Sequence, residues 1–86
     1  MKLQLHLYTK SMPDKLYASK TMDAERPLLG ERWPLEGIEL GALVRQVDHG
    51  YTAPIVVELY AEHPDSEVHR ALDRESGWTR HSRDLD

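Results

Sequence analysis

The absence of cysteine from a chain of 86 residues is the feature that most restricts its fold. A chain this short buries only about 60–65% of the surface that its unfolded form exposes. Without cysteine, neither disulfide bonds nor a thiolate metal site can reinforce its one modest core. Phenylalanine is absent too, so Leu, Val, Ile, Tyr and Trp must form that core. The lack of cysteine fits a reducing compartment, and we expect a cytoplasmic protein.

The N-terminal sequence MKLQLHLYTK alternates apolar and polar residues. A secretory signal peptide needs a continuous apolar run of about 7–15 residues, and a membrane span needs about 18 or more. Neither kind of run occurs in the sequence. We therefore expect a soluble protein with no membrane contact.

The net charge of −4 is unevenly distributed along the chain. Residues 1–22 carry four lysines and one aspartate, residues 23–61 carry seven acidic side chains against three arginines, and residues 62–86 carry seven against four. Nucleic-acid-binding proteins usually have a basic excess, because neutralising phosphates supplies much of their affinity. The charge disfavours direct nucleic-acid binding and suits a basic protein partner.

The first segment has the pattern of a β-hairpin. Leu3, Leu5 and Leu7 alternate with polar or amphipathic residues, which is typical of a half-buried strand. The sequence SMPD at 11–14 is a turn signal, and residues 15–21 are expected to return as a second strand, with Leu16 and Ala18 facing inward. Residues 23–35, which contain two prolines and one glycine, are expected to form an ordered loop.

Residues 36–48 have the clearest helical pattern. Leu40, Leu43, Val44 and Val47 lie at i, i+3, i+4 and i+7, which predicts one apolar stripe, and Gly50 would end the helix. We expect this stripe to pack on the sheet.

Residues 51–60 form the best candidate strand, with Ile55, Val57 and Leu59 on one face. Pro54 should lie at its start or on an open side, because proline cannot donate a ladder hydrogen bond. This strand is a candidate partner for residues 3–8, and an open side would also permit a homodimer. A short second helix is expected from Pro64, with Val68, Ala71 and Leu72 buried and Gly77 as its end.

The expected order is therefore β-β-α-β-α. It predicts a small α+β fold in which a sheet of about three strands packs against one or two helices. Residues 1–77 would form the single domain, and residues 78–86 a polar, flexible tail.

The sequence contains no recognisable metal site. Among its five histidines, His63 and His69 are six residues apart, which places them on different faces of a helix, whereas a two-histidine site prefers i, i+4 spacing. His6, His49 and His81 belong to separate expected elements. We expect no bound metal and no other cofactor.

Catalytic motifs are also missing. Ser66, His69 and Asp73 can be combined into a triad, but Ser66 is not on a G-x-S-x-G elbow. Pairs of acidic residues such as Glu36 with Glu39 are common on solvated surfaces. The sequence has no dinucleotide fingerprint, no Walker loop and no C-x-x-C motif. We expect a protein that is not an enzyme.

The best candidate site is a partner-binding surface around Glu31, Trp33, Glu36 and Glu39. Trp is enriched among interface hot spots, and acidic side chains steer a basic partner toward the surface. The alternative for Trp33 is that it closes the core beneath the loop.

Two fragments resemble bacterial immunity proteins. KLQLHLYTKSMPD, residues 2–14, resembles the opening hairpin of the cloacin immunity family, and VDHGYTAPIVVEL, residues 47–59, is similar to part of the immunity protein for tRNA-cleaving colicins. Both families consist of small, acidic, cytoplasmic proteins that bind and block a basic nuclease toxin. The resemblance implies such a role here, and it carries no toxin-contacting residue over to this chain.

Three functions follow as hypotheses. The first is an immunity protein that blocks a basic nuclease toxin. The second is a phage-encoded inhibitor of a host defence or transcription complex, such as an anti-CRISPR protein. The third is a small enzyme or ligand-binding domain that uses Tyr, His and acidic groups near the strand ends, which a pocket with a shifted ionisable group would favour.

Overall fold

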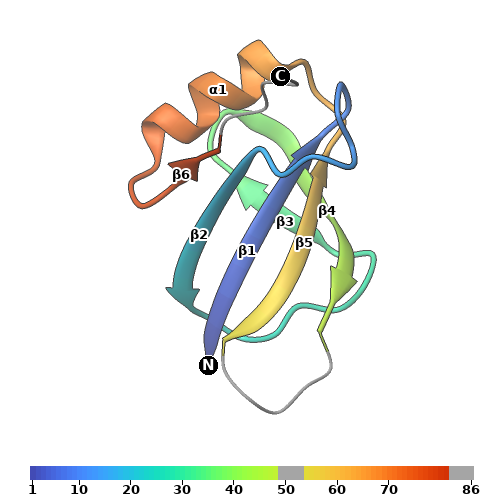
Figure 1. Cartoon of the computed structure of the whole chain (residues 1–86), viewed down its shortest axis with the longest axis vertical. Coiled ribbons are helices and arrows are strands. Elements are labelled where there is room, and N and C mark those ends of the chain that lie inside the picture. The colour runs from blue at the N-terminus through green and yellow to red at the C-terminus, as the bar shows by residue number, and fades with distance from the viewer. Residues whose placement is uncertain (49–53, 82–86) are drawn as a thin grey trace.

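A computed structural model describes residues 1–48 and 54–81, and its elements are drawn in Figure 1. Six strands and one α-helix occur in this part of the chain. They are β1 (Lys2–Thr9), β2 (Ala18–Asp23), β3 (Arg32–Leu35), β4 (Ile38–Val47), β5 (Ile55–Ala61), α1 (Asp65–Arg74) and β6 (Thr79–Arg80).

The strands form one mixed sheet in the order β3-β4-β5-β1-β2-β6. The central pair, β1 and β5, is parallel, with Leu3 opposite Ile55 and Leu7 opposite Leu59. The other neighbouring pairs are antiparallel. The expected pairing of the fifth strand with the first is therefore confirmed.

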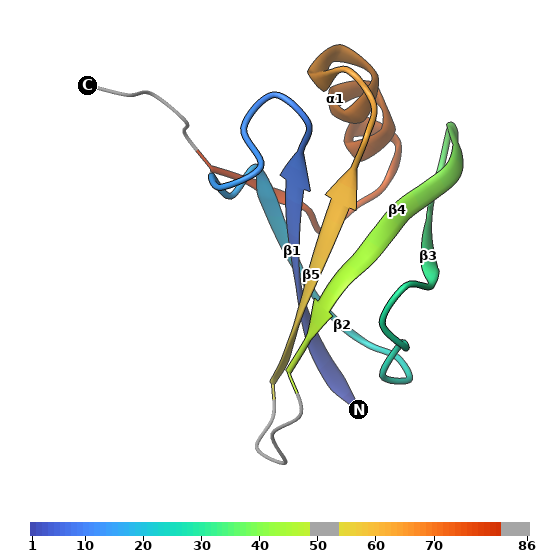
Figure 2. The same ribbon diagram turned by 90° about the vertical axis from the view of Figure 1, so that its right-hand side faces the viewer.

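The core lies on one face of this sheet. The side chains of Leu3, Leu5, Leu7, Val57 and Leu59 are fully buried there. They belong to one cluster with Val68, Ala71 and Leu72, which are the three buried residues of α1. Figures 1 and 2 place α1 near the end of the sheet where β1 and β5 finish, away from the N-terminus. The expected apolar stripe of this helix is confirmed.

The expected sheet of about three strands packed against one or two helices is wrong. The sheet has six strands and a single short helix accompanies it among the described residues. The main cause is the segment expected as a helix over 36–48, most of which is strand β4. Its expected end at Gly50 lies outside the described residues.

Irregular backbone explains why β4 has a helical pattern of apolar residues. Leu40 and Gly41 have φ of 68° and 60°, and the pairing with β5 shifts between Val44 and Gln46. An extra residue in a strand moves the following side chains to the opposite face. The buried positions Ile38, Ala42, Val44 and Val47 are consequently spaced by two, three or four residues. The expected stripe is not a buried face, because Leu40 is 71% exposed.

Other strands also begin and end at residues that differ from the expected ones. The returning strand is Ala18–Asp23 instead of residues 15–21, although Ala18 is buried as expected. Residues 32–35 of the expected loop form β3, which pairs with β4. Pro54 precedes β5, but β5 pairs on both sides. That strand therefore has no open side, and a homodimer remains a prediction.

The described part of the expected tail contributes to the sheet. Thr79 pairs with Ser19 and Arg80 with Ala18, while the indole of Trp78 is half-buried against the core cluster. The main-chain nitrogen of His81 donates a hydrogen bond to the carbonyl oxygen of Tyr17, at 2.9 Å. Residues 82–86 lie outside the described residues.

Candidate functional site

The four residues of the expected partner-binding surface lie on or beside the β3–β4 hairpin. Glu31 directly precedes β3, Glu36 is in the turn, and Glu39 is near the start of β4; all three are exposed. Trp33, on β3, is half-buried and packs against the core cluster. The three carboxylates thus lie on this hairpin or directly before it, on the β3 side of the sheet.

Large exposed apolar side chains lie in the same segment. Leu28 is 69% exposed, and Leu29 and Leu40 are each 71% exposed. Met1 is the only other large apolar side chain of comparable exposure in the part of the chain that the structure describes. We call Leu28, Leu29, Glu31, Glu36, Glu39 and Leu40 the hairpin surface. Leu40 was part of the expected helical stripe, and its exposure follows from the strand that takes the place of that helix.

The hairpin surface borders an edge of the sheet. β3 is the outermost strand on this side, and it is only four residues long. Pro34 within it removes one main-chain donor, which weakens the edge as a template for another strand. Side chains on this surface, more than main-chain pairing, are therefore available to a partner.

A charged cleft lies between the hairpin turn and α1. It has a volume of about 340 Å³, and its walls include Gly37, Glu39, His63, Glu67, Arg70 and Arg74. We call these six residues the charged cleft. Sequence reasoning missed this site, although Arg70 and Arg74 are spaced i, i+4 on an expected helix. Gly37 and Glu39 line the same cleft only because the tertiary structure places the hairpin next to α1.

The face of the sheet opposite the core carries a compact polar and aromatic cluster. The guanidinium of Arg45 lies 4.6 Å from the ring centroid of Tyr8 and 5.5 Å from that of Tyr60. Its Nη2 atom is 3.6 Å from Oε1 of Glu58. The guanidinium is therefore close to both tyrosine rings and to the Glu58 carboxylate. Glu58 and Tyr60 belong to β5, where they alternate with the buried Val57 and Leu59.

Ionisable groups on this face have shifted pKa values. Burial raises the pKa of Tyr8 above 10.0, the Glu58 carboxylate raises it further, and Arg45 opposes both effects. Burial lowers the pKa of His6 below 6.5; Glu58 acts in the opposite direction, and His81 adds to the lowering. The imidazole of His81 is 2.8 Å from the hydroxyl of Ser19, which lies opposite His6 in the register of β1 and β2.

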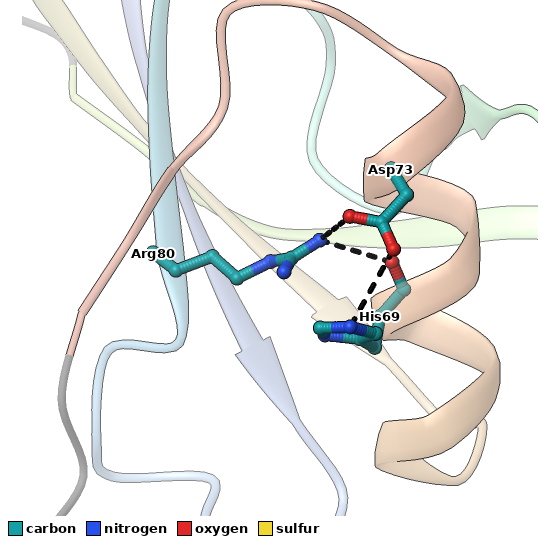
Figure 3. Close-up of polar contacts among 3 residues, drawn as sticks. All are labelled: His69, Asp73 and Arg80. Carbon is teal, nitrogen blue, oxygen red and sulfur yellow. Dashed lines mark hydrogen bonds and ion pairs between the residues drawn. The ribbon is translucent and has the colours of Figure 1, made fainter.

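Two members of the Ser66, His69 and Asp73 combination, which was not expected to be catalytic, contact each other and Arg80 (Figure 3). His69 Nε2 is 3.5 Å from Asp73 Oδ2, but Arg80 donates a hydrogen bond to the other carboxylate oxygen of Asp73. Arg80 also donates to the main-chain oxygen of His69, at 3.1 Å. Arg80 lowers the pKa of Asp73, chiefly through the hydrogen bond that its guanidinium donates to the Asp73 carboxylate. The three residues connect β6 to α1.

Neither a metal-binding group nor a membrane-spanning helix occurs among residues 1–48 and 54–81. No three histidine or acidic side chains there are grouped in a way that would hold a metal ion, and no helix there is long and apolar enough to cross a membrane. His49 lies outside these ranges. The expected absence of a metal or cofactor remains a prediction.

Comparison with protein-family models, with curated proteins and with solved structures finds no match. The resemblance of residues 2–14 and 47–59 to immunity proteins therefore rests on those residues alone.

Proposed function

We propose that this chain is a non-enzymatic inhibitor that binds a basic protein in the cytoplasm, most specifically an immunity protein that blocks a nuclease toxin. The hairpin surface is the proposed contact, together with the half-buried Trp33 of β3. The observation that carries the proposal is the coincidence of exposed leucines and exposed carboxylates in one segment of the chain.

The composition of the hairpin surface suits protein binding. Protein interfaces combine an apolar centre with a polar rim, and a few anchoring side chains carry most of the binding energy. Leu28, Leu29 and Leu40 are candidates for the anchors. Glu31, Glu36 and Glu39 would attract a basic partner over a distance comparable to the Debye length, about 8–10 Å in physiological salt.

The backbone of Leu40 also supports this proposal. A leucine at φ 68° is in a conformation that costs a non-glycine residue about 1–2 kcal/mol, and here it leaves the side chain in solvent. Strain of this kind is concentrated at functional sites. An anchor for a partner would account for a strained, exposed leucine in place of glycine.

Capture from the native host provides the test. Tagged wild-type protein should retain a basic partner that is toxic when expressed alone and harmless when co-expressed with this chain. The variant Glu36→Gln with Glu39→Gln should mainly slow association and reduce its dependence on salt, because exposed charges steer the encounter. Asp14→Asn with Glu62→Gln, which removes two exposed carboxylates on other segments, is the matched control.

Anchoring residues should behave differently from charges. Trp33→Ala should raise the dissociation rate and weaken binding by roughly 2 kcal/mol or more, provided that melting curves show a folded variant. A partner that binds both hairpin variants like wild type would contradict the proposed surface. A non-toxic partner from a host defence or transcription complex would replace the immunity role with the phage-inhibitor hypothesis. Catalytic turnover by the isolated chain would overturn the inhibitor proposal itself.

A further inference from the structure

The charged cleft is a second candidate site, which shares Glu39 with the hairpin surface. Arg70 and Arg74 lie one helical turn apart on α1, and Glu67 lies on the same wall. Gly37 and Glu39 of the hairpin form the facing wall, and His63 precedes the helix. Opposite charges from two distant parts of the chain therefore surround one cavity of about 340 Å³.

The four charged side chains of the cleft are not paired with one another. Ion pairs such as Arg45 with Glu58, His69 with Asp73 and Arg80 with Asp73 lie outside the cleft. Among residues 1–48 and 54–81, Glu39, Glu67, Arg70 and Arg74 form neither an ion pair nor a hydrogen bond through their side chains. The buried Nδ1 atom of His63 likewise has no hydrogen-bond partner there. Two cationic and two anionic groups are thus available to a ligand.

Gly37 allows one of the cationic groups to approach the hairpin. A Cβ atom at this position would lie 2.6 Å from Nη1 of Arg74, closer than such contacts allow, and the φ of 83° also favours glycine. The guanidinium of Arg74 therefore lies close to the main chain of the turn, on the hairpin side of the cleft.

We propose that the charged cleft binds a small zwitterion of the α-amino-acid class. Guanidinium groups present paired N–H donors that match a carboxylate, and glutamate carboxylates accept hydrogen bonds from an ammonium group. A simple anion would gain from Arg70 and Arg74 but would be repelled by Glu39 and Glu67. A simple cation would gain from Glu39 and Glu67 but would be repelled by Arg70 and Arg74. A ligand that carries both charges satisfies both pairs and adds no net charge to the cleft.

A titration with a zwitterion and its two singly charged counterparts tests the proposal on the purified chain. L-Alanine is compared with propionate, which lacks the ammonium group, and with ethylamine, which lacks the carboxylate, all at one ionic strength. Main-chain amide signals of Glu39 and of residues 67–74 in NMR spectra should shift with saturation for L-alanine only. The two singly charged probes should bind at least tenfold more weakly.

Arginine variants assign the effect to the cleft. Arg70→Gln and Arg74→Gln should each raise the apparent Kd for L-alanine at least tenfold, whereas Lys2→Gln, which removes an exposed positive charge at the start of β1, should leave it unchanged. Arg70 is exposed, so its variant should fold even if Arg74→Gln does not. Saturable binding of propionate with equal strength would overturn the proposal in favour of a plain anion site.

Two further outcomes would also overturn it: no saturable shift with L-alanine, or unchanged binding by both arginine variants. None of these measurements requires a protein partner. Failure here therefore leaves the proposed inhibitor function intact, and failure to find a toxic partner leaves the cleft proposal intact.

Discussion

Replacing Leu40 with glycine should make the protein more stable, although it removes a large apolar side chain. Leu40 has a φ of 68° and is 71% exposed, so the substitution relieves left-handed strain and sacrifices little packing. Relief of the strain should contribute about 1–2 kcal/mol. The greater freedom of glycine in the unfolded chain should cost about 0.4–1 kcal/mol. We expect a net gain of about 0.5–1 kcal/mol, which corresponds to roughly 2–8 °C in Tm for a domain of this size.

Two matched variants isolate the backbone effect. Leu29 is also 71% exposed but does not have a positive φ, so Leu29→Gly should lose about 0.4–1 kcal/mol. Gly41 has a φ of 60°, and a Cβ atom there would overlap the carbonyl oxygen of Trp33. Gly41→Ala should therefore cost about 2–5 kcal/mol, from strain and from displacement of β3.

Thermal and urea unfolding followed by circular dichroism measure all three changes. The order of stability should be Leu40→Gly, wild type, Leu29→Gly and finally Gly41→Ala. The reasoning would be refuted if Leu40→Gly were destabilised as much as Leu29→Gly, because the left-handed backbone of Leu40 would then carry no strain. If the leucine also anchors a partner, Leu40→Gly should bind more weakly while it unfolds at a higher temperature.

Three further predictions concern the core, pH and metals. Leu5→Ala should lower the free energy of unfolding in urea by about 2–5 kcal/mol, because this side chain is fully buried. Leu43→Ala should lower it less, because Leu43 is only half-buried. Equal losses of stability would contradict the assigned faces of the sheet. The lowered pKa of His6 should give stability that is complete above pH 6.5 and declines as pH falls below it toward the folded-state pKa, since the unfolded state then binds more protons. His6→Gln should flatten this decline in unfolding measured across that pH range, and an unchanged profile would exclude His6 as its source. Elemental analysis should find no stoichiometric zinc, and a chelator should not change Tm; one zinc retained per chain would refute this.

Local patterns predicted the elements whose geometry is regular. The alternation of Leu3, Leu5 and Leu7 identified β1, and the apolar stripe of Val68, Ala71 and Leu72 identified α1. The prediction for the segment that forms β4 was wrong because bulges introduce steps of three and four between its buried residues. A helix spaces its apolar residues in the same way. Nothing local marks a bulge except Gly41, and glycine is equally compatible with a loop.

The candidate sites were predictable only in part. The acidic residues beside Trp33 were visible in the sequence, because the hairpin surface comes from one continuous segment. The charged cleft was not visible, because Glu39 and Arg74 line the same cleft only once β4 and α1 have packed in the folded protein. The contacts of Arg45 with Tyr8 and Tyr60 likewise depend on the order of three strands.

The parallel pairing of β1 with β5 has a consequence for how the chain folds. Leu3 pairs with Ile55 and Thr9 with Ala61, so the centre of the sheet joins the beginning of the chain to a segment synthesised much later. At about 5–20 residues per second, β1 would wait roughly 3–10 s on the ribosome before its partner is made. During that time β1 can pair along its main chain only with β2, its other neighbour in the sheet. Because this long loop must close before the central contacts form, we expect folding in milliseconds to seconds, as in other sheets with distant pairings.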